Sequence, residues 1–539
     1  MYKIYNFFFL SLFILLLAAC STTTKEEQKP IETEKTTAKS TEQHRPHYHF
    51  TPPSKWMNDP NGMVYYEGEY HLFYQHYPDS TVWGPMHWGH AVSTDLVTWE
   101  HLPIALYPDS LGLIFSGSAV IDWKNTSGLG ENGQPPMVAI YTYHLMEGEK
   151  TGKHDFQTQG IAYSNDKGRT WTKYEGNPVI PNTDNIHDFR DPKVSWHEAT
   201  QQWTMILAAN DKVMIYNSKN LKDWTHTSDF GLGIGSQARP WECPDLFELS
   251  LEDGSSKWVM IVSIGNRLED IQAPNGGSGT QYFVGDFDGK IFTLDSKFAE
   301  DVKDGNALWI DYGTDNYAGV TWSDVPKEDG RRLFMGWMSN WLYAQNVPTE
   351  SWRSAMTIAR TLSLHETDDG LRLFSKPVKE MESLRGKSYN IPANTLTETL
   401  NLTEKLGFSS TTSELQLEFT MSPDSKADFG IELSNSKGEK VRIGFDATSN
   451  QFYSDRRESG KTDFSKHFAA KKHLAPRIAA GNVVKMQVFV DVASAELFAD
   501  DGATVMTDIF FPNEDFAELK IYSSGEGVRL NEGTVWEIR

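Results

Sequence analysis

Cysteine is nearly absent from this chain, which has two in 539 residues. Cys20 belongs to an N-terminal export signal described below, so Cys243 is the one thiol left for the folded part. A single thiol can form neither an internal disulfide nor a Cys-rich metal site. The 16 histidines, as in His87-Trp88-Gly89-His90, lack the helix-borne spacing of a metal-binding pair, so we predict no metal and no cofactor.

Basic residues are also few. Lys and Arg number 50 against 73 Asp and Glu, which gives a formal net charge of −23. Phosphate binding needs clustered Lys and Arg side chains, and the sequence has no such stripe, so nucleic acid is excluded as a partner. The acidic balance favours a neutral substrate over an anionic one.

The longest apolar run, residues 7–19, is too short for an ordinary membrane span. With Lys3 before it and Leu-Ala-Ala-Cys at 17–20, it is typical of an export signal covering residues 1–20. The ending resembles the lipobox of bacterial lipoproteins, in which the cysteine becomes the lipidated first residue. We therefore predict an exported, membrane-anchored lipoprotein, periplasmic or at the cell surface, that touches the membrane only through the lipid on Cys20. The alternative is a cleaved secretory signal with a chance cysteine.

Composition divides the rest of the chain. Residues 21–44 contain no aromatic side chain and are mostly Thr, Lys, Glu and Gln, as expected of a disordered tether. The remainder is long enough for two domains. Its heavy aromatic content, 12% with 17 Trp, suits large β-cores or surfaces that stack on sugars.

Short strand-like runs dominate from residue 49 to about residue 364, and no long helical period appears. A loose repeat, a polar turn followed by a tryptophan, is compatible with four-stranded blades joined by loops of variable length. We therefore predict an all-β chain in which residues 45–365 form a five-bladed β-propeller. The repeat recurs at residues 93–99, 164–171 and 218–224, and clear strand runs are residues 70–74, 203–207, 258–262 and 332–337.

The texture changes after the predicted propeller. Residues 366–388 are expected to link two domains, with a short helix at 376–385. From residue 389 to 539, apolar and polar residues alternate as in a half-buried antiparallel β-sandwich. This half shows no catalytic cluster, so we expect structural support from it rather than secondary sugar binding. The clearest alternating runs are residues 415–419, 485–490 and 517–522.

One short motif, Trp-Met-Asn-Asp-Pro-Asn-Gly at residues 56–62, carries chemical information. Asp59 precedes a proline, which favours an extended backbone, and Asn61-Gly62 is a tight-turn signal. The motif therefore predicts Asp59 at the tip of a strand, with the amide of Asn58 beside it to orient a hydroxylated substrate. By itself, the same tetrapeptide is more often a plain turn.

Two further acidic residues stand in similar settings, Asp191 in Arg-Asp-Pro and Glu242 in Glu-Cys-Pro. Asp191 is again expected to be extended before its proline, and both lie at the start of a predicted strand. The innermost strands of propeller blades begin at one rim of the channel, so the three carboxylates are expected to converge there. Repulsion raises the pKa of one member of such a group and makes it a proton donor, and glycosidic cleavage uses a carboxylate pair of this kind. Taken singly, Arg190-Asp191 reads more simply as an ion pair and Glu242 as a turn acid, and the three roles stay unassigned at this level.

At these positions the sequence resembles a family, glycoside hydrolase family 32, which contains invertases, inulinases and levanases. The resemblance covers nearly all of the mature chain and rests on four motifs in the family's order, residues 56–62, 115–118, 190–192 and 242–245. It implies a five-bladed propeller followed by a β-sandwich, and a retaining mechanism on β-fructofuranosides. It also implies that Asp59 is the nucleophile, Glu242 the acid/base and Asp191 the residue that holds fructose hydroxyls in the transition state.

The same resemblance implies a set of substrate-binding residues around a terminal fructose. Amide and guanidinium groups can bond two hydroxyls, and an indole offers a flat face to the CH side of a sugar. The alternative for Trp83 and Phe115 is a place in a blade core, and for Gln75 a structural amide. The implied residues are Asn58, Gln75, Trp83, Phe115, Ser116, Arg190 and, near Trp337, Trp341.

Residues 339–344 and 347–353 resemble the exo-acting inulinase and levanase branch. We therefore predict release of terminal fructose from levan or inulin, and from sucrose, through a covalent fructosyl-enzyme intermediate. Three alternatives remain: fructosyl transfer, which shares both halves of the mechanism; a noncatalytic surface glycan-binding lipoprotein, which does not need both Asp59 and Glu242; and an inverting five-bladed glycosidase acting on arabinan or xylan, which the motif at 56–62 disfavours.

Overall fold

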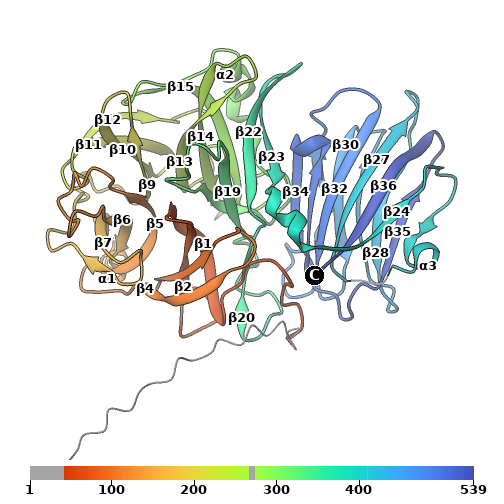
Figure 1. Ribbon diagram of the computed structural model, residues 1–539, viewed down its shortest axis with the longest axis horizontal. Coiled ribbons are helices and arrows are strands. Elements are labelled where there is room, and N and C mark those ends of the chain that lie inside the picture. Colours follow the sequence, from red (N-terminus) through yellow and green to blue (C-terminus); the bar gives the residue numbers. More distant parts are fainter. Residues whose placement is uncertain (1–41, 266–272, 409–410) are drawn as a thin grey trace, which may run out of the picture. The chain divides into compact units, whose positions relative to one another are not determined.

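Antiparallel β-sheets form the framework of the computed structural model, which describes residues 42–265, 273–408 and 411–539 (Figure 1). The predicted export signal, Cys20 and most of the predicted tether lie outside the described residues. The last tether residues contact the folded chain: Gln43 Nε2 donates to the carbonyl of Pro512 at 3.4 Å, and His44 is 2% exposed. The described fold therefore begins at residue 42. In the described ranges, no helix is long and apolar enough to cross a membrane.

Five four- or five-stranded sheets of the described chain form the N-terminal half. The first contains β1 (Lys55–Tyr66), β2 (Glu69–Tyr77), β3 (His87–Ser93), β4 (Glu100–Leu106) and β20 (Trp352–Arg353). The second contains β5 (Leu113–Ile121), β6 (Met137–His144), β7 (Gln157–Ser164) and β8 (Thr172–Lys173), and the third β9 (Phe189–His197), β10 (Gln202–Ala209), β11 (Lys212–Ser218) and β12 (Trp224–Phe230). The fourth contains β13 (Trp241–Ser250), β14 (Ser256–Ile264), β15 (Gly279–Phe287), β16 (Phe292–Leu294) and β17 (Leu308–Trp309), and the fifth β18 (Tyr317–Thr321), β19 (Arg332–Met338), β21 (Ala355–Met356), β22 (Arg360–Thr367) and β23 (Gly370–Pro377).

These sheets are the blades of a propeller. Their first strands, β1, β5, β9, β13 and β18, contact one another in that order, and β18 also contacts β1. The ring is closed by β20, which pairs in parallel with Lys55 and Trp56 at the start of β1. The predicted all-β fold with a five-bladed β-propeller is confirmed.

The tryptophan repeat occupies the equivalent turn in each of the first three blades. Its copies form the turn into the outermost strands β4, β8 and β12. In each copy the serine hydroxyl donates to a carboxylate or amide oxygen two residues later, and in the second and third the indole of the tryptophan donates to a carbonyl inside the turn. The serine bonds join Ser93 to Asp95, Ser164 to Asp166 and Ser218 to Asn220, and the indole bonds join Trp171 to Gly168 and Trp224 to Leu221.

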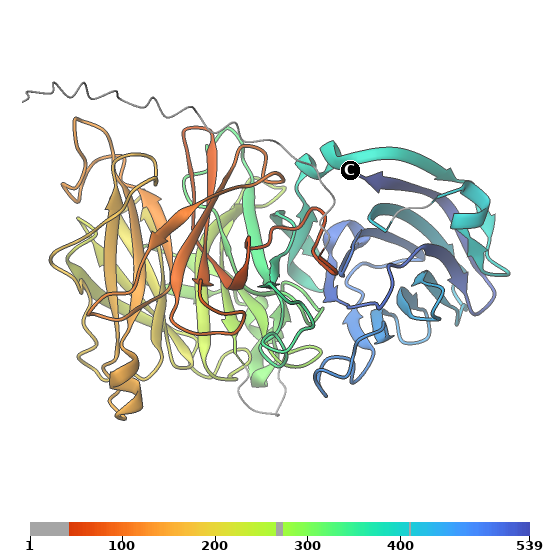
Figure 2. The same ribbon diagram turned by 90° about the horizontal axis from the view of Figure 1, so that it is seen from below.

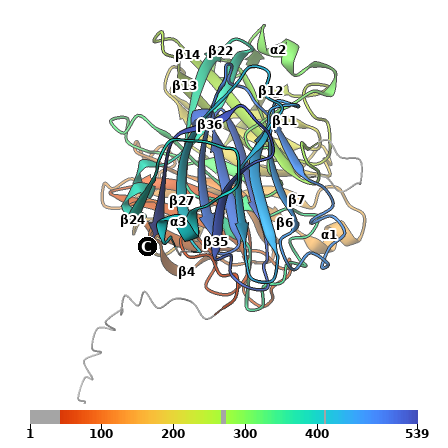
Figure 3. The same ribbon diagram turned by 90° about the vertical axis from the view of Figure 1, so that its right-hand side faces the viewer.

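Two further sheets form the C-terminal half, the predicted β-sandwich, which is confirmed (Figures 2 and 3). One contains β24 (Arg385–Ile391), β25 (Asn394–Thr395), β36 (Val528–Ile538), β27 (Ser413–Met421), β32 (Val483–Asp491), β33 (Ser494–Ala499) and β34 (Thr504–Ile509). The other contains β26 (Leu400–Asn401), β35 (Glu518–Ser523), β28 (Asp428–Ser434), β29 (Lys440–Asp446), β30 (Gln451–Glu458) and β31 (His473–Pro476).

The boundary between the halves lies later than residue 365. The outermost strand of the fifth blade, β23, pairs with β22 as far as Pro377, so this hairpin belongs to the propeller and not to the linker. A 3₁₀ helix, η2 (Lys379–Leu384), stands where a short helix is predicted, and β24 follows it directly. The other short helices are α1 (Met146–Lys150), α2 (Phe298–Asp301), α3 (Leu402–Leu406), η1 (Lys303–Gly305) and η3 (Asp500–Gly502).

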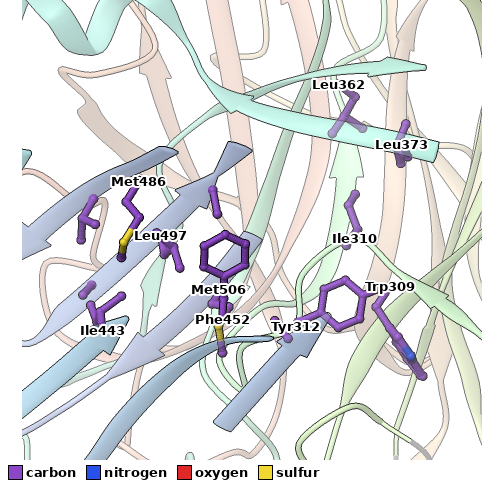
Figure 4. Packing of buried hydrophobic residues seen from close by; sticks show 14 of the residues in the cluster. Trp309, Ile310, Tyr312, Leu362, Leu373, Ile443, Phe452, Met486, Leu497 and Met506 are labelled. Carbon is purple, nitrogen blue, oxygen red and sulfur yellow. The ribbon is translucent and has the colours of Figure 1, made fainter. Parts of the chain in front are cut away.

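One apolar cluster joins the two halves. Trp309 of β17 in the fourth blade and Tyr312 from the connection to the fifth blade belong to the same buried cluster as the sandwich core (Figure 4). So do Leu362 and Leu373 from the outer strands of the fifth blade. Met506 of β34 is one of its sandwich members. Burial of apolar surface on both sides of the junction stabilises the propeller and sandwich as one unit.

Buried charges cross the same junction. His49, ahead of the first blade, lies between two carboxylates of the sandwich, with Nδ1 2.7 Å from Asp491 Oδ2 and Nε2 2.9 Å from Glu496 Oε1. Arg360 of β22 bonds Glu496 and also Asp311 Oδ2, at 2.9 Å. Burial lowers the pKa of His49, but bonds to both carboxylates outweigh it and raise that pKa to about 9. His49 is therefore protonated at neutral pH.

Replacing His49 by Gln is expected to lower the free energy of unfolding by about 3 kcal/mol near neutral pH, because two buried carboxylates lose a cationic partner. The folded-state pKa is raised, so this stabilisation is fully present below pH 6.5 and is lost as pH rises through about 9. Denaturant unfolding of wild type and variant across this range measures the difference. His47→Gln, an exposed histidine two residues away, is the control. A difference that stays constant between these pH values would contradict the assignment.

Candidate active site

Every innermost strand of the propeller carries one extra residue near its N-terminal end. In each blade, the pairing advances by three residues on the inner strand while it advances by two residues on the neighbouring strand. This extra residue defines a β-bulge. Bulges re-aim side chains, and here five of them surround one end of the channel. The irregularities lie between Met57 and Pro60 in β1, Ile114 and Gly117 in β5, Arg190 and Lys193 in β9, Glu242 and Asp245 in β13, and Tyr317 and Val320 in β18.

The bulges correct two local expectations. The tight turn predicted at Asn61-Gly62 is wrong, because β1 continues through both residues to Tyr66. Asn61 instead braces the bulge, donating from Nδ2 to the carbonyl of Asp59 at 3.0 Å and accepting from the amide of Gly117 at 3.1 Å. Asp191 is not extended either: its φ is 64°, a left-handed conformation that this bulge requires.

A pocket of about 520 Å³ opens at this end of the channel. All ten residues expected at the site line it: Asp59, Asp191, Glu242, Asn58, Gln75, Trp83, Phe115, Ser116, Arg190 and Trp341. The lining residues that were not expected are His144, Glu149, Phe156, Gln157, Asp188, Pro240, Gly265, Leu342, Gln345 and His467.

Asp59 is held by neighbours on both of its oxygens. Asn58 Nδ2 donates to Oδ1 at 3.0 Å, and Ser116 Oγ donates to Oδ2 at 2.7 Å. Asn58 is itself fixed by the indole of Trp56, which donates to its Oδ1 at 2.7 Å. Burial, and then the charge of Glu242, raise the pKa of Asp59 above its usual value, while the two donors lower it.

Asp191 lies deeper. Its Oδ2 accepts from the amide of Cys243 at 3.0 Å, and its own amide donates to Thr142 Oγ1 at 3.0 Å. Burial raises the pKa of Asp191 to about 7, with the charges of Glu242 and Asp59 adding to the rise and that of Arg190 opposing it. The positive charge of Arg190 therefore compensates the negative charge of Asp191 only in part.

Cys243 lies between two of the carboxylates. Its Sγ is 3.6 Å from Asp59 Oδ2 and 3.7 Å from Asp191 Oδ2. Burial raises the pKa of this thiol well above its usual value, and the neighbouring carboxylates raise it further. The residue therefore stays a neutral thiol that can donate weakly to either acid, and it is not a nucleophile.

Glu242 is more accessible than Asp191. Its side chain is 20% exposed against 6% for Asp191. Arg190 Nη2 donates to Oε1 at 2.9 Å, and the Tyr317 hydroxyl donates to Oε2. A Cβ on Gly265 would come within 2.5 Å of Oε2, so the backbone there leaves room for this carboxylate.

The remaining pocket residues present groups suited to a sugar. Gln75 Nε2 is buried and has no hydrogen-bond partner among the described residues, so it is a donor available to a ligand. Trp83 and Phe115 meet edge to face at 6.1 Å, and Phe115 stacks on the His144 ring at 4.2 Å. Trp341, rather than the fully buried Trp337, reaches the pocket.

Two family models match the chain, the glycosyl hydrolases family 32 N-terminal domain over residues 49–377 and the family 32 C-terminal domain over residues 380–537. The protein belongs to glycosyl hydrolase family 32. The resemblance found in the motifs is thereby confirmed.

Relatives of this family 32 protein include a levanase from Bacillus subtilis, 49% identical over 500 residues, which span 92% of this chain and 71% of the levanase. Among solved structures, the exo-inulinase from Aspergillus awamori superposes with a TM-score of 0.82 at 35% identity, covering 93% of this chain and 99% of that one. The β-fructofuranosidase from Schwanniomyces occidentalis, solved with fructosyl-erythritol, has a TM-score of 0.81 at 34% identity, covering 92% and 98%.

Sequence reasoning missed two side chains that position the charged groups in the pocket of this family 32 protein, Asp188 and Tyr317. Asp188 accepts from Arg190 Nη1 at 2.5 Å and so fixes the guanidinium that binds Glu242. Its place two residues before Arg190, just ahead of β9, was a usable signal that the two side chains lie on the same side of an extended segment. Tyr317 comes from the fifth blade, and no motif marks it.

Replacing Asp191 by Asn is expected to stabilise the protein above pH 7. Its folded-state pKa is raised from 3.8 to about 7, so this carboxyl costs the wild type stability as pH rises between these values, and the Asn variant lacks that contribution. The gain should be absent near pH 4 and amount to about 1–4 kcal/mol above pH 7. Thermal and denaturant unfolding at both pH values measure it. A variant no more stable than wild type at pH 7.5 would show that burial imposes no cost on this carboxylate.

Proposed function

We propose that this family 32 enzyme is a retaining β-fructofuranosidase that releases terminal fructose from β-fructans, levan or inulin, and from sucrose. The observation that supports this most is the convergence of Asp59, Asp191 and Glu242 in one pocket with a different set of partners for each. The levanase, exo-inulinase and β-fructofuranosidase relatives favour the same substrate class.

Asp59 is proposed as the nucleophile. Its carboxylate is fixed from both sides by Asn58 and Ser116, so it cannot rotate away from a bound sugar. Its oxygen attacks the anomeric carbon of fructose and the glycosidic bond breaks, which leaves a fructosyl ester on Asp59.

Glu242 is proposed as the acid/base, because its side chain is more exposed than that of Asp191, and Asp59 is already held as the attacking group. In the first step it gives its proton to the departing oxygen of the leaving sugar. In the second it takes a proton from water, whose oxygen attacks the fructosyl ester and restores the free Asp59 carboxylate. Arg190 and Tyr317 orient Glu242 from two sides.

Asp191 is proposed to hold fructose hydroxyls as positive charge develops on the ring. Asn58, Gln75, Ser116 and Arg190 are proposed to bind further hydroxyls, with Trp83, Phe115 and Trp341 on the apolar faces. The unpartnered Nε2 of Gln75 supports this assignment, because a buried donor left without a partner is costly unless a ligand satisfies it.

The closed floor of the pocket supports attack at chain ends. Beneath the carboxylates the channel narrows to a void of about 10 Å³ lined by Pro60, Asp191, Pro192, Cys243 and Val320, among others. A polymer cannot thread through such a space, which favours entry of a chain end from the mouth. Early release of long oligosaccharides instead of fructose would contradict exo action.

The catalytic proposal is tested with wild type and Asp59→Asn on levan, inulin, sucrose and an arabinan control, with products separated by chromatography. We expect fructose from the fructans and sucrose with wild type, and a loss of at least about 1,000-fold in the variant. Asp253→Asn, an exposed carboxylate in the loop between β13 and β14, should retain full activity. Longer fructosylated products in place of free fructose would identify a transferase, and arabinose release would identify a different glycosidase.

We also propose that residues 1–20 direct export and that Cys20 carries a lipid anchor, leaving the enzyme at a membrane facing the periplasm or the exterior. Two of the relatives are named as extracellular exo-inulinases, which favours export.

Replacing Cys20 by Ser is expected to move the enzyme from the membrane fraction to the soluble fraction and to abolish incorporation of labelled fatty acid in a bacterial host. Cys243→Ser is the matched control, because it removes the other cysteine and should leave the lipid label unchanged. Unchanged labelling of the Cys20→Ser protein would overturn the anchor.

A further inference from the structure

A second pocket, of about 800 Å³, opens at the opposite end of the propeller channel. Its walls come from the C-terminal ends of the inner strands, including Tyr65 of β1, Ile121 of β5 and Thr321 of β18, whereas the active-site residues come from their N-terminal ends. Asp59 and Tyr65, which line different pockets, are six residues apart on one strand, at most about 20 Å along its length.

Tryptophan side chains form the mouth of this pocket. Trp123 is 59% exposed and is the one tryptophan of the described residues that is an exposed large hydrophobic. Its indole nitrogen donates to Asp324 Oδ1 at 2.8 Å, and Asp324 also accepts from the amide of Ile121 at 2.9 Å. Trp196 is held in the same way by Glu198 Oε2 at 2.7 Å. Both rings are fixed by carboxylates before any ligand arrives.

Charges at the floor are already compensated. Lys193 Nζ lies 3.1 Å from Asp245 Oδ2 and donates to the carbonyl of Thr321. Asp324 receives its two N–H donors, and the ammonium of Lys124 lies 4.4 Å from the centre of the Trp196 ring. These charges are paired within the protein, which leaves the indole faces beside them available to a neutral ligand.

We propose that this pocket is a second saccharide-binding site, which holds a segment of β-fructan chain against Trp123 while the active site works on a chain end. Fixed indole faces beside paired polar groups suit a neutral, hydroxylated ring. The choice of fructan as occupant rests on the proposed function. A second binding site for the same polymer raises the effective concentration of chain ends at the active site and leaves the catalytic step unchanged.

Binding is tested by native electrophoresis through gels containing levan or inulin, with every protein in the Asp59→Asn background so that the gel polymer is not degraded. Trp123→Ala is expected to weaken retention about three- to tenfold. Trp123→Phe, which keeps a stacking face, should retain most of it. Tyr107→Ala removes an exposed aromatic that lines neither pocket and should migrate like the parent. Trp196→Ala provides an independent variant if Trp123→Ala does not fold.

Kinetics on otherwise wild-type enzyme separate this site from the catalytic one. Trp123→Ala should hydrolyse sucrose within twofold of wild type and show a raised KM for the polymer alone. Unchanged retention and polymer KM in folded Trp123→Ala and Trp196→Ala proteins would overturn the second site. If wild type hydrolyses fructan but no fructan gel retards the Asp59→Asn protein, this inference fails and the proposed function stands. If neither occurs, the proposed function itself fails.

Discussion

The active site depends on one backbone device, the extra residue near the start of each innermost strand. A regular strand alternates its side chains between two faces, so consecutive residues such as Asn58 and Asp59 would point to opposite sides of the blade. A bulge breaks this alternation and turns both toward the channel end. Because the same irregularity recurs in all five blades, side chains far apart in sequence meet in one pocket.

This arrangement gathers like charges in a buried place, and the surroundings compensate them unevenly. Arg190 and Tyr317 donate hydrogen bonds to Glu242. Asn58 and Ser116 donate hydrogen bonds to Asp59. Asp191 has one backbone donor on Oδ2 and a guanidinium nitrogen 4.0 Å away. Repulsion among the carboxylates is therefore only partly compensated in the free site. Positive charge that develops on a substrate during the reaction would reduce this repulsion. The buried ionic pairs at the sandwich junction and the shared apolar cluster stabilise the fold around it.

The fold was predictable from the sequence to the level of sheets, because period-two alternation and the tryptophan turns depend on local patterns. The boundaries of the blades were less predictable. Residues 366–377 were predicted as part of the linker, but they belong to the β22–β23 hairpin of the fifth blade. Asn61-Gly62 has the composition of a turn, but its neighbours in β2 and β5 hold it in a bulged strand. The left-handed φ of Asp191 had no sequence signal, since proline after it favours extended backbone. Tyr317 also had no sequence signal, because only closure of the ring of blades brings the fifth blade beside Glu242.

The same strand that supplies Asp191 also closes the channel. Lys193 follows Asp191 by two residues, and its ammonium binds Asp245 and the carbonyl of Thr321 on the other side of the bulge. Asp245 in turn lies three residues after Glu242. Two inner strands therefore each contribute a carboxylate to the active site and a charged side chain to the contact among Lys193, Asp245 and Thr321, which forms a plug in the channel. The plug closes the floor of the pocket, and this shape favours attack at a chain end. It also leaves the far end of the channel as a separate cavity with its own lining, free to evolve a contact with polymer while the geometry around the three carboxylates stays fixed.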